Sequence, residues 1–300
     1  MELKEVIKEK LSKDEEQLNF IFSDKMNIIV TAPAGCGKTT AMITKIAWEL
    51  STGHIHSNKK VLAMTFSVNA AMKIKDSLKI LLPDLVSNPT YYLSEVDVAN
   101  YHNFAMRVLF KHGYCLNSEF MNLSDFQVVD DADKNIKDNL DEMELEMFQK
   151  LNITLKTSNK IDLEIVINNY WNILNKKLIT KHIITYNGIL VAAIKLLQKE
   201  QIKKFYKKYY EMVIVDEFQD TNLLGYLLIC ELIGDNISIF LGDDVQKIYG
   251  FMGAVEKIFD MISITVPTET FEFKNNYRFK KNNRIRELDS LIRNYAERCV

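Results

Sequence analysis

Short, almost wholly apolar runs alternate along the chain with longer segments in which apolar residues recur every three or four positions. NIIVTA (27–32), MVIV (212–215) and ISIFLG (237–242) are runs of the first kind and are rich in β-branched residues. Such runs predict strands buried on both faces, as in a parallel sheet. The segment TTAMITKIAWEL (39–50) is of the second kind and predicts a helix directly after the first run.

The middle of the chain shows the helical pattern over a long stretch. Apolar residues have helical spacing in FAMRVLFKHG (104–113), LEIVINNYWNIL (163–174) and GILVAAIKLLQKEQIKKFYKK (188–208). Residues 105–207 as a whole are too many for a loop inside a compact domain. We therefore expect an inserted, largely helical subdomain in this region.

The composition is typical of a soluble globular protein. Of the 300 residues, 47% are hydrophobic and 26% charged, and no apolar run is long enough to span a membrane. The charged N-terminus is not a secretory signal, and four cysteines without CxxC spacing suit a reducing, cytoplasmic environment. The net charge of −2 argues against a uniformly basic nucleic-acid binder. Two basic stretches, 195–208 and 274–286, stand out, and the simplest interpretation of each is a solvated helix face.

The stretch TAPAGCGKTT (31–40) lies between the first predicted strand and its helix, where phosphate-binding loops lie. Gly35 and Gly37 allow backbone N–H groups to close around a phosphate, and the following helix adds its dipole. Lys38 is placed to reach the β- and γ-phosphates, and the Thr39 hydroxyl to bind Mg²⁺. Ala32 stands where this loop pattern usually begins with glycine. A flexible loop without a ligand is the weaker alternative.

A second strand, MVIV, ends in two acidic residues. The strand is expected to deliver Asp216 and Glu217 to the carboxyl edge of the sheet, where ligands bind in open α/β folds. Asp216 would then hold Mg²⁺ through water, and Glu217 would orient and deprotonate the attacking water. The alternative is a pair of surface acids without a role.

Two further segments carry candidate residues. Asp243, Asp244 and Gln246 follow the run ISIFLG, at the same edge of the predicted sheet, where they could sense the nucleotide. Arg278 lies in the basic segment FEFKNNYRF (271–279) and could reach a γ-phosphate in the manner of an arginine finger.

These segments, in this order, resemble the motifs of the UvrD/Rep/PcrA-type superfamily 1 DNA helicases. The resemblance extends from about Ser12 to Phe279, and Gln17 precedes Lys38 by 21 residues, where this family has its adenine-contacting glutamine. The matching segments, from motif I through motifs Ia, Ib, II and III to motif IV, are APAGCGKTT (32–40), VLAMTFSVNAAMKIK (61–75), VANYHNFAMRVL (98–109), VDEFQDTN (215–222), GDDVQKIYGFMGA (242–254) and NNYRF (275–279).

The resemblance implies an α/β fold, a RecA-like P-loop NTPase sheet of parallel strands with helices on both faces and an inserted helical subdomain. Strands are then expected near 27–32, 61–66, 95–99, 212–216, 237–242 and 270–273. We expect a RecA-like ATP-binding domain in two parts, residues 1–104 and 208–275. The inserted helical subdomain is expected at residues 105–207, and the start of a second motor domain at residues 276–300.

ATP and Mg²⁺ are the cofactors that the resemblance implies. The residues expected to bind the nucleotide are Gln17, Ala34, Gly35, Cys36, Gly37, Lys38, Thr39, Thr40, Tyr277 and Arg278. Those expected to act in catalysis are Lys38, Asp216, Glu217, Gln246 and Arg278, with Thr39 and Asp216 as the metal ligands.

Single-stranded DNA is the expected partner, because motors of this family pass bases over aromatic side chains. The positions that match are Phe66, Asn69, Tyr101, His102, Phe104, Tyr249 and Phe251. A core role is the alternative for Phe66 and Phe104, and also for the aromatic pair Tyr249 and Phe251.

Three departures from the family pattern concern nucleotide and DNA contacts. Cys36 stands where Ser or Thr is frequent, Thr40 where an arginine often covers the adenine, and Met252 where an arginine is usual. We expect Cys36 to be tolerated because that position offers mainly its backbone, and Tyr277 to remain as a stacking partner for adenine.

The family carries a second RecA-like domain, with a further arginine for the γ-phosphate, after the segment that matches NNYRF. We expect this lobe to come from a longer form of the chain or from a partner protein. Two functions are compatible with the motifs. The first is an ATP-driven DNA helicase or translocase in repair, recombination or anti-phage defence, and the second is a non-motor ATP-binding module that regulates or scaffolds a DNA-processing complex. Glu217, Gln246 and Arg278 favour the first, because nucleotide binding alone does not need them.

Overall fold

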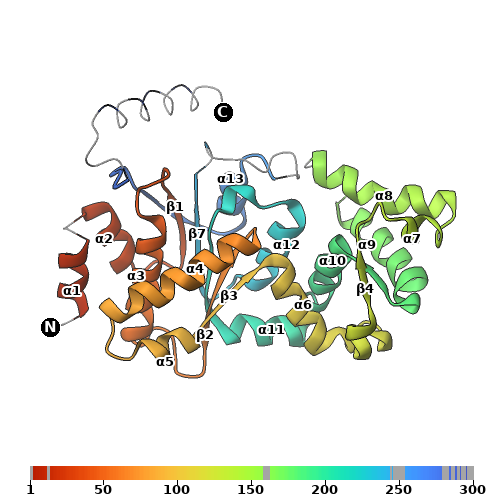
Figure 1. Ribbon diagram of the computed structural model, residues 1–300, viewed down its shortest axis with the longest axis horizontal. Helices are drawn as coiled ribbons and strands as arrows, with labels where there is room; N and C mark the ends of the chain where they lie inside the picture. The colour runs from red at the N-terminus through yellow and green to blue at the C-terminus, as the bar shows by residue number, and fades with distance from the viewer. Residues whose placement is uncertain are drawn as a thin grey trace.

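Six parallel strands form the central sheet (Figure 1). In spatial order they are β3 (Val96–Asn100), β2 (Lys60–Thr65), β6 (Tyr210–Val215), β7 (Ile237–Gly242), β1 (Asn27–Thr31) and β8 (Glu269–Glu272). The structure is a computed structural model, and it describes residues 3–11, 14–157, 163–243, 245, 254–278, 284, 288, 291 and 295. All six expected strands are present, with boundaries within two residues of the predicted ones.

Alternate residues of the strands enter two different cores. In β6, Met212 and Ile214 join one cluster of buried side chains, whereas Val213 and Val215 join the other. Such alternation buries both faces of a strand, which is why these runs contain almost no polar residues. The predicted parallel sheet is therefore confirmed.

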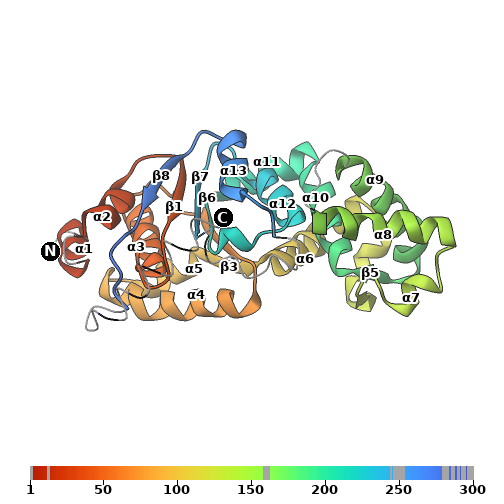
Figure 2. The same ribbon diagram turned by 90° about the horizontal axis from the view of Figure 1, so that it is seen from above.

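Helices cover both faces of the sheet (Figure 2). One face carries α1 (Leu3–Lys10), α2 (Glu15–Phe22), α3 (Lys38–Ser51), α4 (Val68–Leu81) and α5 (Pro89–Ser94). The other carries α6 (Tyr101–His112), α10 (Tyr186–Leu197), α11 (Glu200–Tyr209), α12 (Leu223–Leu232) and α13 (Ile258–Thr265). This is the RecA-like arrangement that the sequence predicts.

Between β3 and β6 the chain is mainly helical, as expected from the apolar spacing. Besides α6, α10 and α11 it contains α7 (Lys134–Lys137), α8 (Glu142–Thr157) and α9 (Leu163–Ile173). It also contains a small parallel sheet of β4 (Gln127–Val129) and β5 (Ile183–Thr185). The sequence did not predict this pair, because three residues are too few to show a strand period.

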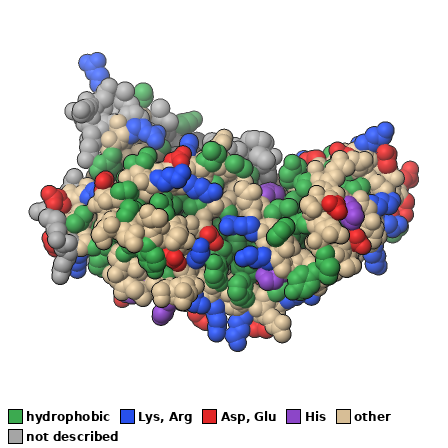
Figure 3. All heavy atoms as spheres, turned by 60° about the horizontal axis from the view of Figure 1, so that its bottom comes forward, with side chains coloured by type: hydrophobic (Ala, Val, Ile, Leu, Met, Phe, Trp, Pro, Cys, Tyr) green, Lys and Arg blue, Asp and Glu red, His purple; other side chains and the backbone are tan. Residues whose placement is uncertain are grey.

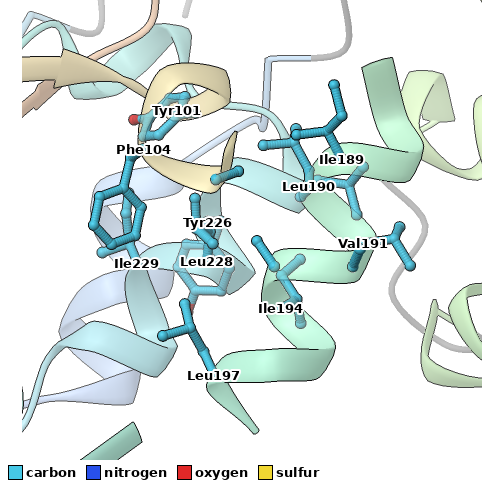
Figure 4. Close-up of a cluster of buried hydrophobic side chains, with 14 of the residues drawn as sticks. Tyr101, Phe104, Ile189, Leu190, Val191, Ile194, Leu197, Tyr226, Leu228 and Ile229 are labelled. Atoms are coloured by element: carbon cyan, nitrogen blue, oxygen red, sulfur yellow. The ribbon is translucent and has the colours of Figure 1, made fainter. Parts of the chain in front are cut away.

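One apolar cluster contains residues of both the sheet and the helical segment. Figure 4 shows the part of this cluster where α6, α10 and α12 meet. In α10, Ile189, Ile194 and Leu197 are almost fully buried, and this helix packs against α6 and α12. Helix α12 supplies Leu228 and Ile229 to the same cluster. α10 therefore fixes the helical segment to the sheet. Among the described residues, no helix has the length and apolar character needed to cross a membrane.

Candidate active site

The loop between β1 and α3 has a backbone that requires its two glycines. Gly35 and Gly37 have φ angles of +85° and +81°, in the left-handed region that residues with side chains rarely adopt. A Cβ atom at Gly35 would also lie 2.8 Å from Cβ of Arg278, which is closer than real contacts allow. Helix α3 begins at Lys38, directly after this turn. The loop therefore leads into a helix N-terminus, the arrangement that binds phosphate.

Two residues that depart from the usual loop pattern have buried side chains. Ala32 is 0% exposed and Cys36 is 1% exposed, and both join the core beside α3. The backbone N–H of Ala32 donates to the carbonyl of Gly242 at 3.0 Å, which attaches the start of the loop to β7. The core thus accommodates the methyl group of Ala32 in place of glycine.

The ammonium group of Lys38 lies between the loop and the acidic end of β6. Nζ donates to the carbonyl of Ala32 at 2.9 Å and lies 3.9 Å from Oε2 of Glu217. Thr39 and Thr40 follow in the first turn of α3, half-buried. The structure therefore brings the predicted phosphate-binding lysine and the predicted general base together at one edge of the sheet.

Asp216 is buried directly after β6, and its backbone N–H donates to the carbonyl of Met64 at 2.8 Å. Burial, and then the neighbouring Glu217 carboxylate, raise the pKa of Asp216 to about 6, although Lys38 acts in the opposite direction. A buried carboxylate of this kind favours a cation. The described residues contain no group of three or more His, Cys, Asp or Glu side chains arranged for a metal ion. The Thr39 hydroxyl and the Asp216 carboxylate, together with nucleotide phosphates and water, form a ligand set that suits Mg²⁺.

Gln219 holds Glu217 in place, a role that sequence reasoning missed. Nε2 of Gln219 donates to Oε2 of Glu217 at 2.8 Å, and Oε1 accepts from the backbone N–H of Asp243 at 3.1 Å. A Cβ atom at Gly242 would overlap Oε1 of Gln219, so a larger residue there would displace the Gln219 side chain. Gln219 is 1% exposed. It lies inside the matched segment VDEFQDTN, but a sequence shows no contact between Gln219 and the end of β7.

The segment after β8 lies against the phosphate loop. Tyr277 donates its backbone N–H to the carbonyl of Gly35 at 2.8 Å, and Nδ2 of Asn276 donates to the carbonyl of Ala34 at 3.3 Å. On the other side, Nε2 of Gln17 donates to the carbonyl of Cys36 at 3.0 Å. The predicted adenine residues Gln17 and Tyr277 therefore flank the same loop.

Asp14 links these two flanks and was also missed. Its carboxylate caps α2 by accepting from the Gln17 backbone N–H at 3.1 Å, and it accepts from Nδ2 of Asn275 at 3.0 Å and from the Tyr277 hydroxyl. Burial by itself would raise the pKa of Asp14, but the hydrogen bonds from Tyr277, Gln17 and Asn275 outweigh it and leave the pKa below its ordinary value. An Asp three residues before a buried helical residue is a cap signal that the sequence offered.

The Cβ atom of Arg278 lies next to Gly35, and the Arg278 backbone N–H donates to Oδ1 of Asn276 at 3.0 Å. The side chain is exposed. Of the other predicted catalytic and DNA-binding residues, Gln246, Tyr249 and Phe251 lie outside the described residues, as do Asp244 and Met252.

Three of the predicted DNA residues lie at the same sheet edge. Thr65 and Asn100 are register partners at the ends of β2 and β3, so Phe66 and the first turn of α6, which contains His102, follow neighbouring strands at this edge. Phe66 and His102 are half-buried, and Asn69 is exposed in the first turn of α4. Nε2 of His102 is buried without a hydrogen-bond partner in the described part of the chain. Burial lowers the pKa of His102.

Two predicted DNA residues, Tyr101 and Phe104, are instead core residues, which corrects the expectation from sequence. Tyr101 is 3% exposed, and its hydroxyl lies 2.7 Å from Oγ1 of Thr221. Phe104 is 1% exposed and packs edge-on against Tyr206 and Tyr210, with ring centroids 5.8 and 6.1 Å apart. Both side chains point from α6 toward the apolar core, so neither offers a face to a base (Figure 4).

The family model of the UvrD/REP helicase N-terminal domain matches residues 13–267. DNA helicase II of Escherichia coli (strain K12) is 28% identical over 90% of this chain and 39% of its own length. The ATP-dependent DNA helicase PcrA of Staphylococcus aureus is 24% identical over 94% of this chain and 40% of its own. The ATP-dependent DNA helicase UvrD1 of Mycobacterium leprae is 23% identical over 94% of this chain and 40% of its own length. The chain thus spans about two-fifths of the length of these relatives.

Proposed function

The chain belongs to the UvrD/Rep helicase family, and we propose that it is the ATP-binding half of a motor that moves along single-stranded DNA. Relatives of this chain are DNA helicases by name. The observation that carries the proposal is the 3.9 Å approach of Lys38 Nζ to Glu217 Oε2, beside the buried Asp216. This approach supports the proposal that a phosphate-binding cation, a water-activating base and a metal ligand belong to one site.

ATP is the proposed substrate. The loop from Ala34 to Gly37 and the start of α3 would cradle its phosphates, and Gln17 and Tyr277 would flank the adenine. When bound, Mg²⁺ supplies positive charge to the β- and γ-phosphates, and Thr39 and Asp216 would hold it. Arg278, whose Cβ atom lies next to Gly35, would add positive charge at the γ-phosphate.

Glu217 is the proposed general base. In the structure its carboxylate is engaged by Lys38 and by Gln219. A bound triphosphate would compete for Lys38, because phosphate oxygens carry more charge than one carboxylate. Glu217 would then keep its bond to Gln219 and accept a proton from the attacking water. Gln246 remains the proposed sensor of this state.

Single-stranded DNA is the proposed track, and Phe66, Asn69 and His102 form its contact edge on this domain. We call these three residues the DNA-facing edge. Tyr249 and Phe251 remain proposed contacts. A second RecA-like lobe, from a longer form of the chain or from a partner, would complete the ATP site. Repair, recombination and anti-phage defence are processes in which such a motor would act.

ATP hydrolysis with and without single-stranded DNA tests the proposal, on this chain and on any longer form. The chain alone should bind Mg-ATP, and the complete motor should hydrolyse it faster when DNA is present. The Lys38→Ala variant should lose most ATP affinity while staying folded, and Glu217→Gln should bind ATP without turning it over. ATP binding with no hydrolysis in any form would favour the regulatory module instead.

A further inference from the structure

An open hollow of about 530 Å³ lies along β3, lined mainly by α6 and at one side by Lys75 of α4. Strand β3 is at the edge of the sheet, and Val98 lines the floor of the hollow. Figure 3 shows a face of the molecule on which lysine and arginine side chains lie next to apolar ones. The hollow is separate from the phosphate loop, which is formed by β1 and α3.

The charged groups that line the hollow are all positive. Lys75 comes from α4, and Arg107 and Lys111 come from α6, one helical turn apart. No acidic side chain lines it. Asp97 lies 3.8 Å from the Arg107 guanidinium and offsets part of its charge, whereas Lys75 and Lys111 form no ion pair within the residues that the structure describes. The hollow therefore attracts an anionic partner.

An exposed aromatic ring stands among these cations. Phe110 is 78% exposed, and Met106 precedes it by one turn on the same face of α6. Met106 is half-buried and Leu123 is buried beside it, so the ring of Phe110 is the exposed apolar group of this hollow. An aromatic ring flanked by positive charges is the combination that binds unpaired bases and their phosphates.

We propose that this hollow is a second subsite for single-stranded nucleic acid, with one base stacked on Phe110 and the adjoining phosphates held by Arg107, Lys111 and Lys75. The proposal rests on the proposed function, since α6 also carries His102 of the DNA-facing edge at its N-terminal end. A strand that leaves that edge along α6 reaches Phe110 two turns later. The subsite would add contacts to a strand that extends beyond the DNA-facing edge.

Fluorescence anisotropy of the 300-residue chain with a short and a long labelled oligothymidylate tests the subsite. The short strand covers the DNA-facing edge only, and the long strand covers both. Phe110→Ala should weaken binding of the long strand by about 5- to 100-fold and leave the short strand unchanged. Phe110→Tyr should restore the affinity. Lys111→Gln should reduce the slope of log affinity against log salt by about 0.7 for the long strand.

Matched controls are Met143→Ala, which removes a similarly exposed apolar side chain from α8, and Lys137→Gln on α7. Both should bind like the unaltered chain. Unchanged affinity for the long strand in Phe110→Ala would overturn the subsite and leave the proposed function intact. Full affinity in Phe110→Leu would overturn the stacking of a base on the Phe110 ring. An unaltered chain that binds neither strand would overturn the proposed DNA partner itself.

Discussion

Gln219 joins the carboxylate of Glu217 to the backbone of Asp243, with hydrogen bonds of 2.8 and 3.1 Å. Glu217 has a left-handed backbone, with φ of +51°, so it is presented on a turn that few residues adopt. The bond from Gln219 restricts where its side chain can point. Because Asp243 follows β7, a shift of the segment after β7 would be felt at the proposed general base.

Replacement of Gln219 by methionine keeps the volume and removes both hydrogen bonds. We expect turnover of ATP to fall about 10- to 100-fold, since a hydrogen bond to a charged group is worth about 1.5–3 kcal/mol. The affinity for Mg-ATP should stay unchanged, because Gln219 does not line the phosphate loop. Single-turnover hydrolysis and nucleotide titration on the longest active form would measure both. A loss of affinity equal to the loss of turnover would contradict a role in orienting Glu217.

Asp216 should make the stability of the protein depend on pH. Its pKa is about 6 in the folded chain, above its ordinary value of 3.8, so the unfolded chain releases this proton first as the pH rises. The stabilising contribution is therefore complete below about pH 4 and is lost as the pH rises to about 6. Asp216→Asn stays neutral, and we expect it to be more stable than the unaltered chain by on the order of 1–3 kcal/mol at about pH 8.

Urea unfolding without nucleotide or metal, at about pH 4 and about pH 8, would measure this difference. The exposed Asp125→Asn serves as control and should change neither value. The gain in Asp216→Asn should be confined to the higher pH and be accompanied by weaker binding of Mg-ATP. Equal stability of the two chains at both pH values would rule out an unfavourable buried charge at this position.

Asp14 should affect the base-binding part of the ATP site and spare the phosphate-binding part. Asp14→Ala removes the cap of α2 and the link from Gln17 to Tyr277, so we expect ATP affinity to fall about tenfold, in line with about 1 kcal/mol for a lost cap plus the lost link. Affinity for tripolyphosphate should be unchanged, because that ligand contacts the loop alone. Asp14→Asn keeps an acceptor for the cap, so its ATP affinity should lie between that of Asp14→Ala and that of the unaltered chain. A parallel loss for ATP and tripolyphosphate would instead indicate general damage to the loop.

Phe104 and Phe66 should separate stability from DNA binding. Phe104→Ala empties a fully buried site and should lower the free energy of unfolding by about 3–5 kcal/mol. Phe66→Ala changes a half-buried side chain at the DNA-facing edge and should cost about 1–3 kcal/mol of single-strand binding with a smaller loss of stability. Denaturant unfolding and fluorescence anisotropy on both variants would decide the assignment. A large loss of stability in Phe66→Ala, with DNA affinity retained, would make Phe66 a core residue too.

The sequence by itself determined the sheet and the order of the site segments. Strands buried on both faces leave uninterrupted apolar runs, and the residues that follow them meet at one edge because the strands are parallel. That reasoning placed Lys38, Asp216 and Glu217 together, and the structure brings Lys38 and Glu217 to 3.9 Å. Glycine at positions 35 and 37 is equally a local requirement, since the backbone there has positive φ.

Only the tertiary structure decided which aromatic side chains are available to a ligand. It also decided which polar side chains form hydrogen bonds between segments that are far apart in the sequence. Tyr101 and Phe104 follow β3 as His102 does, but α6 turns them toward α11 and α12, and their sequence neighbours contain no sign of that rotation. The links made by Gln219 and Asp14 span 24 and 263 residues. Hydrogen bonds between distant segments depend on how strands and helices pack, and no local pattern of polar and apolar residues encodes them.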